Sequence, residues 1–163
     1  MKINIFNHQK SLRLSKKLIK DQISLVLLEE DIHCDELNIF FVSKKDICDL
    51  HEKYLNDPSP TDCISFPIDD PFSKETYKHL GEVFVCTDIA IEYAKENNLS
   101  PYDEATLYMI HGILHLIGYD DILQKDIKTI RKKEKKYMTL LKEQLKGISQ
   151  KHINSWKKEG HVD

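Results

Sequence analysis

Residues 111–121 read His-Gly-Ile-Leu-His-Leu-Ile-Gly-Tyr-Asp-Asp, and we expect the fold to be organised around this stretch. An α-helix turns about 100° per residue, so His111 and His115 lie one turn apart on one helix face. Gly118 can end the helix, because glycine enters the left-handed conformation without steric cost. The chain can then reverse and carry Asp121 back toward the two imidazoles.

Two histidines and a carboxylate in this arrangement are typical ligands of a zinc ion. Such ligands bind zinc at about 2.0–2.2 Å, and three of them leave the fourth position open, as in catalytic zinc sites. We therefore predict one Zn²⁺ bound by His111, His115 and Asp121, with hydrolysis through a bound water. Nickel, cobalt or iron suits the same ligands. The alternative interpretation is a buried helix whose histidines and aspartate satisfy one another.

The spacing also matches the metzincin protease pattern H-E-x-x-H-x-x-G-x-x-H, with two departures. Gly112 stands where those proteases carry their general-base glutamate, and Asp121 stands where they carry a third histidine. The missing glutamate argues against a metal-dependent peptidase. Asp120 is either a group that orients a histidine N–H or a turn residue.

The chain resembles the YbeY family of bacterial endoribonucleases in three segments that occur in family order. Residues 111–121 are similar to H-G-x-L-H-L-x-G-Y-D-H, residues 60–67 (PTDCISFP) to P-T-D-V-L-S-F-P, and residues 80–86 (LGEVFVC) to L-G-D-I-x-I-C. The resemblance implies one α+β domain with a small mixed sheet. It also implies metal-dependent cleavage of single-stranded RNA, in maturation of the 16S ribosomal RNA 3′ end on the assembling small ribosomal subunit with its proteins.

Two positions depart from the family pattern. Asp121 replaces the third metal histidine, and Leu55, in residues 54–58 (YLNDP), replaces the arginine of a phrase such as F-R-G-K-D. Arginine binds a phosphate through two parallel hydrogen bonds, and leucine cannot. An alternative function is therefore a ribosome-assembly RNA-binding factor with a structural metal and little nuclease activity.

Basic residues concentrate toward the C-terminus. Residues 125–163 hold 12 Lys and Arg against 5 Asp and Glu, a net charge of +7, whereas residues 1–124 carry −10. Such a segment can attract RNA phosphates, although a solvated helix face gives the same pattern. The residues expected to contact RNA are Lys53, Arg131, Lys132, Lys133, Lys135 and Lys136, and those expected to line the cleft are Thr61, Asp62 and Ser65.

Composition indicates one globular domain. The 163-residue chain is 40% hydrophobic and 31% charged, which suits a single core. It has no apolar run long enough for a membrane span and no signal-peptide pattern. The four cysteines form no C-x-x-C pair and are expected to be reduced thiols. We therefore expect a cytoplasmic protein with no membrane partner.

Hydrophobic periodicity predicts an α+β domain with a four-stranded sheet and about five helices. Strands are expected at 2–6, 36–42, 63–66 and 82–86, and helices at 11–29 (capped by Ser11), 43–54, 87–97, from 101 through the metal motif, and 123–146. The metal-motif helix is apolar nearly all round, so we expect it at the centre. Gly147 is expected to end the last helix, so that residues 1–146 form one catalytic domain and residues 147–163 a frayed or disordered tail.

Overall fold

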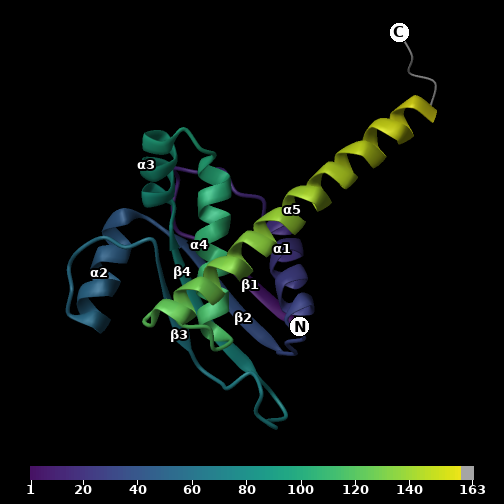
Figure 1. Cartoon of the computed structure of the whole chain (residues 1–163). Coiled ribbons are helices and arrows are strands. Elements are labelled where there is room, and N and C mark those ends of the chain that lie inside the picture. Colours follow the sequence, from purple (N-terminus) through teal and green to yellow (C-terminus); the bar gives the residue numbers. More distant parts are fainter. Residues whose placement is uncertain (159–163) are drawn as a thin grey trace.

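The computed structural model describes residues 1–158, with side chains described for residues 1–144 and 146. Its elements are β1 (Lys2–Asn7), α1 (Lys16–Glu29), β2 (Glu36–Val42), α2 (Lys44–Leu55), β3 (Cys63–Pro67), β4 (His79–Cys86), α3 (Thr87–Asn97), α4 (Pro101–Leu116) and α5 (Gln124–Lys158). The strands form one sheet in the order β1-β2-β4-β3, in which β3 is antiparallel to β4 and the other pairs are parallel (Figure 1). The expected α+β domain with a mixed four-stranded sheet and five helices is thereby confirmed.

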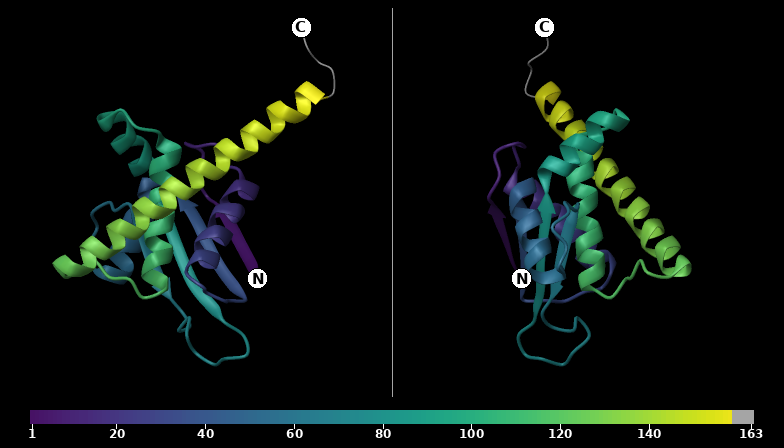
Figure 2. Two further views of the ribbon diagram at one scale, coloured as in Figure 1. Left: turned by 45° about the vertical axis from the view of Figure 1, so that its right-hand side comes forward. Right: turned by 90° about the vertical axis from the view of Figure 1, so that its left-hand side faces the viewer.

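The metal-motif helix α4 lies at the centre, as expected. It is placed between the sheet and α5, and it contacts β3, β4, α3 and α5 (Figure 2). Ile110, Ile113 and Leu114 are fully buried in the same core as Val83 and Val85 of β4. Burial of apolar surface contributes roughly 25 cal/mol per Å². This packing therefore holds the metal motif in one position relative to the sheet.

Both ends of α4 are capped, and its C-terminal end has the glycine that the sequence predicted there. Ser100 caps the first turn, and Gly118 lies just past the last turn with a φ of +102°. The N–H of Tyr119 donates to the carbonyl oxygen of Leu114 at 3.0 Å, which closes the helix end. The glycine conformation reverses the chain and returns Asp121 toward the helix.

Gly112 allows α4 to lie unusually close to the sheet. A Cβ atom at this position would lie 2.4 Å from Cγ1 of Val83 and 3.0 Å from Oγ of Ser65. The Ser65 hydroxyl also donates to the carbonyl oxygen of Gly112 at 3.0 Å. Any side chain here, including the glutamate of the metzincin pattern, would push α4 away from β3 and β4.

Aromatic side chains line the opposite face of the sheet. Phe40 stacks on Phe6 and on Phe84, with ring centroids 4.5 Å and 4.4 Å apart. At the sheet edge, Tyr54 of α2 meets Phe66 of β3 edge to face at 5.0 Å. Such pairs contribute about 0.5–1.5 kcal/mol beyond their buried area. They hold the C-terminal end of α2 beside the edge strand β3.

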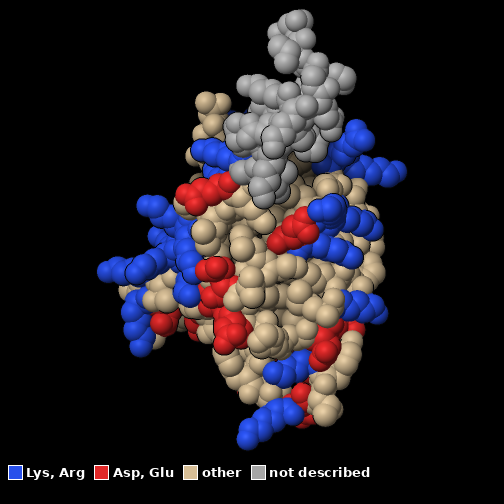
Figure 3. Space-filling view, turned by 90° about the vertical axis from the view of Figure 1, so that its right-hand side faces the viewer, with Lys and Arg blue, Asp and Glu red and all other residues tan. Residues whose placement is uncertain are grey.

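Glu30 connects α5 to the rest of the domain. Its side chain is 8% exposed and forms an ion pair with Nζ of Lys133 at 2.7 Å. It also accepts hydrogen bonds from the hydroxyls of Tyr119 and Tyr137. Figure 3 views the side of the molecule on which α1 lies and shows Lys and Arg interspersed with Asp and Glu. The basic charge of α5 is therefore partly neutralised by acidic groups.

The predicted start of the first helix is wrong. Helix α1 begins at Lys16, and Ser15 rather than Ser11 caps it. Ser11 is engaged elsewhere, because its hydroxyl donates to Oε1 of Gln9 at 3.0 Å and lies 3.0 Å from Oγ1 of Thr87. The tertiary contact with Thr87 engages the Ser11 hydroxyl, so this group does not cap the helix.

The predicted end of the last helix is also wrong, because α5 continues through Gly147 to Lys158. Glycine inside a helix costs only about 1 kcal/mol relative to alanine, so it need not end one. The part of the expected tail at residues 159–163 lies outside the described residues, and the domain boundary at residue 146 stays a prediction. Despite its 35 residues, neither α5 nor any other described helix has an apolar stretch that could cross a membrane.

Candidate metal centre

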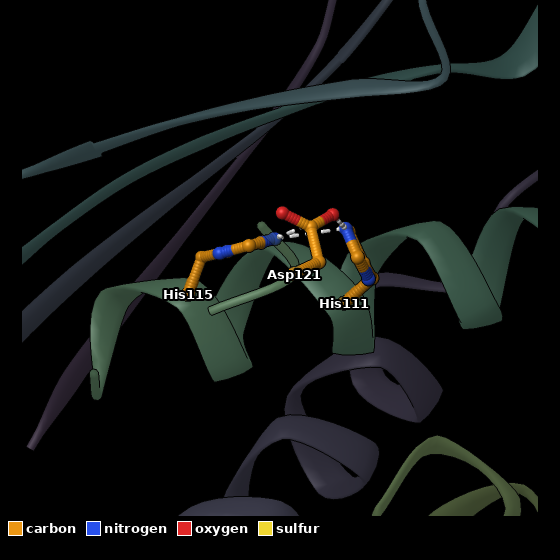
Figure 4. Close-up of side chains that lie close together, drawn as sticks. All are labelled: His111, His115 and Asp121. Atoms are coloured by element: carbon orange, nitrogen blue, oxygen red, sulfur yellow. Dashed lines mark hydrogen bonds and ion pairs between the residues drawn. The ribbon is translucent and has the colours of Figure 1, made fainter. Parts of the chain in front are cut away.

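Two histidines and an aspartate converge near the C-terminal end of α4 (Figure 4). Nε2 of His115 lies 2.9 Å from Nε2 of His111, and Oδ2 of Asp121 lies 3.6 Å from each. Ligand atoms placed about 2.0–2.1 Å from a tetrahedral ion lie about 3.3–3.4 Å from one another. The three side chains therefore have the spacing that one zinc-sized ion requires, and the structure brings together all three predicted ligands.

The three side chains are only partly covered. The exposed fractions are 22% for His111, 26% for His115 and 46% for Asp121. An ion among them would keep a side open to substrate, which is the arrangement of a catalytic rather than a structural site.

Glu134 of α5 holds one of the two imidazoles. Its carboxylate is an acceptor, so Nδ1–H of His111 donates to Oε1 of Glu134 at 2.6 Å. This hydrogen bond leaves Nε2 of His111 with its lone pair facing the other ligands. Burial lowers the pKa of His111, but the hydrogen bond and the charge of Glu134 outweigh it and leave the pKa above its ordinary value.

Sequence reasoning missed Glu134, although the pattern of residues around it gave an indication of its role. It is the single carboxylate in the basic run 131–136, and its spacing places it on the helix face of the buried residues Ile130, Tyr137 and Leu141. A carboxylate on an apolar stripe needs a partner. The position of Glu134 on this stripe therefore indicated that its carboxylate contacts a buried polar group, but it did not indicate which residue supplies that group.

Asp120 lies in the turn after α4. Its Oδ1 accepts a hydrogen bond from the backbone N–H of Asp121 at 2.7 Å. Within the described residues it has no hydrogen bond or ion pair with either histidine. Of the two roles that the sequence left open for Asp120, this hydrogen bond is that of a turn residue. The other role, orienting a histidine N–H, is that of Glu134, which contacts His111.

The predicted cleft residues lie beside the ligands. Thr61, Asp62 and Ser65 line a cavity of about 440 Å³ together with the three candidate ligands. Oδ1 of Asp62 accepts from the N–H of Cys63 at 2.8 Å and from the hydroxyl of Thr61 at 3.2 Å. Oδ2 of Asp62 has no hydrogen-bond partner among the described residues, so it can face a substrate.

Leu55, at the family's arginine position, lies at the rim of this cavity. The residue is 57% exposed. Its side chain therefore adds little to the core, and a longer side chain can project from this position without displacing packed neighbours.

A second and larger cavity meets the first at the candidate ligands. It lies among residues of α3, α4 and α5 and has a volume of about 780 Å³. Asp62, His111 and Asp121 line both cavities, and Arg131 and Glu134 line the larger one. The candidate metal site therefore lies at the junction of two spaces that can hold substrate.

The residues expected to contact RNA fall into three groups. Arg131 lines the larger cavity. Lys133 and Lys136 instead form ion pairs at the C-terminal end of α1, to the capping residue Glu30 at 2.7 Å and to Glu29 at 2.8 Å. The remaining residues of the set are exposed, namely Lys53, Lys132 and Lys135.

The fold and this group of side chains define a class, that of small α+β proteins with a candidate metal site at the end of a central helix. The family model described as Endoribonuclease YbeY matches residues 3–142. The chain is 47% identical over 140 residues to the Endoribonuclease YbeY of Protochlamydia amoebophila, with 86% of this chain and 93% of that protein covered. It is 38% identical over 140 residues to that of Finegoldia magna, with 83% and 90% covered. The chain therefore belongs to the YbeY endoribonuclease family.

A solved structure has the same fold. The solution structure of TM1509 from Thermotoga maritima superposes with a TM-score of 0.64 at 29% sequence identity, covering 90% of this chain and 93% of that one. The arrangement of sheet and helices around α4 is thus shared with a related protein.

Proposed function

We propose that the chain is a Zn²⁺-dependent endoribonuclease that cleaves single-stranded RNA, with the 3′ end of 16S ribosomal RNA as its substrate. The proposed partners are the assembling small ribosomal subunit and its proteins. The observation that carries the chemistry is the convergence of His111, His115 and Asp121 at the junction of two cavities. The ribosomal role is what the resemblance of the three sequence segments to the YbeY family implies, and membership of that endoribonuclease family supports action on RNA.

The chain's own residues orient the reaction and can accept its proton. A bound Zn²⁺ would polarise a phosphate oxygen and lower the pKa of the attacking water. Glu134 holds His111 in the tautomer that presents Nε2. Asp62 lines both cavities, and its Oδ2 has no hydrogen bond to any described residue, so it is the carboxylate that we assign to accept the proton of the nucleophile. No glutamate can fulfil this role from position 112, because Gly112 packs directly against Val83.

The lining of the larger cavity supports a preference for single strands. Unpaired bases can be splayed out and stacked on aromatic side chains, whereas the bases of a duplex are held in their stack. Tyr93 and Tyr108 line this cavity, and Arg131 supplies a cation for a neighbouring phosphate. The smaller cavity lacks such a cation at Leu55, and we therefore expect slow cleavage.

The second candidate function is a ribosome-assembly RNA-binding factor with a structural metal. The exposed Leu55 in place of a phosphate-binding arginine favours it. The partly exposed ligands favour the nuclease, because a structural zinc ion is normally enclosed by four protein ligands. The third candidate, a metal-dependent peptidase, is disfavoured by the tight packing at Gly112.

The test compares metal content with RNA cleavage. Protein loaded with Zn²⁺, and the same protein after chelation, are incubated with a single-stranded RNA that carries the 16S 3′ end and with its duplex form. We expect metal-dependent cleavage of the single strand that is lost in His115→Ala. The control is His33→Ala, since the His33 side chain is 89% exposed and lies outside the site.

Equal cleavage by the wild type and His115→Ala would contradict the proposal. Zn²⁺ retained by the wild type with no cleavage of either RNA would instead favour the RNA-binding factor.

A further inference from the structure

The larger cavity has a greater volume than a metal ion and a phosphate group would occupy. Small-molecule sites typically occupy about 300–1,000 Å³, and this cavity has about 780 Å³ with the candidate metal site at one boundary. Tyr93 and Leu99 on its wall are 47% and 51% exposed. Its apolar and aromatic lining includes Ile89, Tyr93, Leu99, Leu107, Tyr108 and Ile130. Such a lining suits a flat, largely apolar group.

One stripe of α4 runs along this cavity. Glu104, Tyr108 and His111 lie at helical spacings of four and three residues, and all three line the cavity. At 1.5 Å per residue, Glu104 lies about 10–11 Å from His111 along the helix axis. Within one nucleotide, the phosphate and the far edge of the base are separated by a distance of the same order.

Glu104 is a buried carboxylate without a cation. The residue is 8% exposed, and it forms no ion pair with any lysine or arginine of the described residues. Burial raises its pKa above the ordinary glutamate value, and the neighbouring Tyr108 hydroxyl offsets this only in part. A carboxylate accepts several hydrogen bonds, and a buried one is costly until they are made. The cavity wall at Glu104 therefore has acceptor capacity for a ligand with N–H donors.

Guanine is the RNA base that matches this wall. Its Watson–Crick edge presents two adjacent donors, N1–H and N2–H, which a carboxylate can accept as a bidentate pair. Adenine and cytosine place a donor next to an acceptor, and uracil has one N–H between two carbonyl groups. We propose that the larger cavity binds the base next to the scissile phosphate and that Glu104 selects guanine there. The inference rests on the proposed function, because an RNA substrate brings the base to the cavity.

Tyr93 contributes to affinity rather than to the choice of base. A stacked base is recognised through its flat face, which all four bases possess. Removal of the Tyr93 ring should therefore weaken the binding of every base and leave the order of preference unchanged.

The test measures base preference in two ways with the Zn²⁺-loaded protein. The first is the affinity for GMP, AMP, CMP and UMP, and the second is a map of cleavage sites in an unstructured RNA with every dinucleotide. We expect GMP to bind about 5- to 150-fold more tightly than the other three, the range of one bidentate base contact. We also expect cleavage to concentrate beside guanine.

Glu104→Gln is the decisive variant, because it keeps the shape of the side chain and presents one acceptor and one donor. That pair matches the donor and acceptor edges of adenine and cytosine, so the preference for guanine over these two bases should be lost in both measurements. Asp103→Asn is the matched control. Asp103 precedes Glu104 on α4 but pairs with Lys142 at 3.0 Å outside the cavity, so its variant should keep the guanine preference. Thermal unfolding checks that both variants fold.

Equal affinity for all four nucleotides, together with cleavage beside every base, would overturn the inference and leave the proposed nuclease intact. A guanine preference that persists in a folded Glu104→Gln variant would also overturn it. Conversely, a guanine preference in binding that Glu104→Gln abolishes, without any RNA cleavage, would support the base site while contradicting the nuclease.

Discussion

Oε1 of Glu134 lies 2.6 Å from Nδ1 of His111, so a residue of the last helix orients a candidate metal ligand on the central helix. The two residues are 23 positions apart in the chain. Because α5 is also attached to α1 through Lys133 and Glu30, the orientation of the ligand depends on how α5 packs on the domain.

Glu134→Gln should weaken Zn²⁺ binding by about 10- to 100-fold, the usual effect of losing a group that orients a metal-bound histidine. The amide oxygen can still accept the hydrogen bond, but it lacks the charge that makes His111 a stronger ligand. A competition titration against a chromogenic chelator measures the affinity. Glu143→Gln, an exposed position of the same helix, is the control, and equal affinities of both variants would show that Glu134 does not support the site.

The same pair should make the stability of the metal-free protein depend on pH. The pKa of His111 is raised in the folded state, so its stabilising contribution is complete below the ordinary histidine pKa and is lost as the pH rises through the folded value. Glu134→Gln should therefore destabilise the metal-free protein more at about pH 6 than at about pH 8. Urea unfolding at both pH values measures the difference, and a loss that grows with pH would contradict this account.

Asp121→His restores the family's third histidine and removes one negative charge from the candidate ligands. The ion then keeps more positive charge, and the attacking water becomes more acidic. We expect an unchanged metal content and an acidic limb of the pH–rate profile that moves to lower pH. An acidic limb that stays at the same pH, or moves to higher pH, would show that Asp121 does not set the acidity of the attacking water.

Leu55→Arg should accelerate RNA cleavage by about one to two orders of magnitude, because a charge-assisted hydrogen bond contributes about 1.5–3 kcal/mol. Leu55 is 57% exposed at the cavity rim, so the thermal midpoint should hardly change. Single-turnover kinetics measures the effect. Leu28→Arg, at a 75% exposed position of α1, adds the same charge away from the site, and an equal gain from it would point to general attraction of RNA.

Gly112→Ala should lower the free energy of unfolding by about 1–2 kcal/mol, although alanine is the better helix former. The added Cβ would lie 2.4 Å from Cγ1 of Val83, which is fully buried. Val83→Ala removes that atom. The double variant should therefore lose less free energy of unfolding than the sum of the losses in the two single variants. Additive losses in denaturant unfolding would mean that the two positions do not collide.

The sequence by itself determined the features that depend on neighbours within a few residues. The H-x3-H spacing places His111 and His115 on one face of α4, and Gly118 ends that helix and reverses the chain toward Asp121. The strands were predicted to within a few residues at each end for the same reason, since apolar alternation is a local pattern. Family motifs supplied the topology and the nuclease activity, which periodicity alone does not specify.

Only the tertiary structure decided which distant groups complete the site. Asp62 precedes β3, whereas Arg131 and Glu134 belong to α5, and they line one cavity with His111 and Asp121 because the packing of α4 between the sheet and α5 places them there. Contacts of this kind also moved the start of α1, where Thr87 lies against the Ser11 hydroxyl that could have capped the helix. Such partners are chosen by the free energy of packing the whole chain, and local sequence patterns carry no information about which distant residue packing will bring into contact.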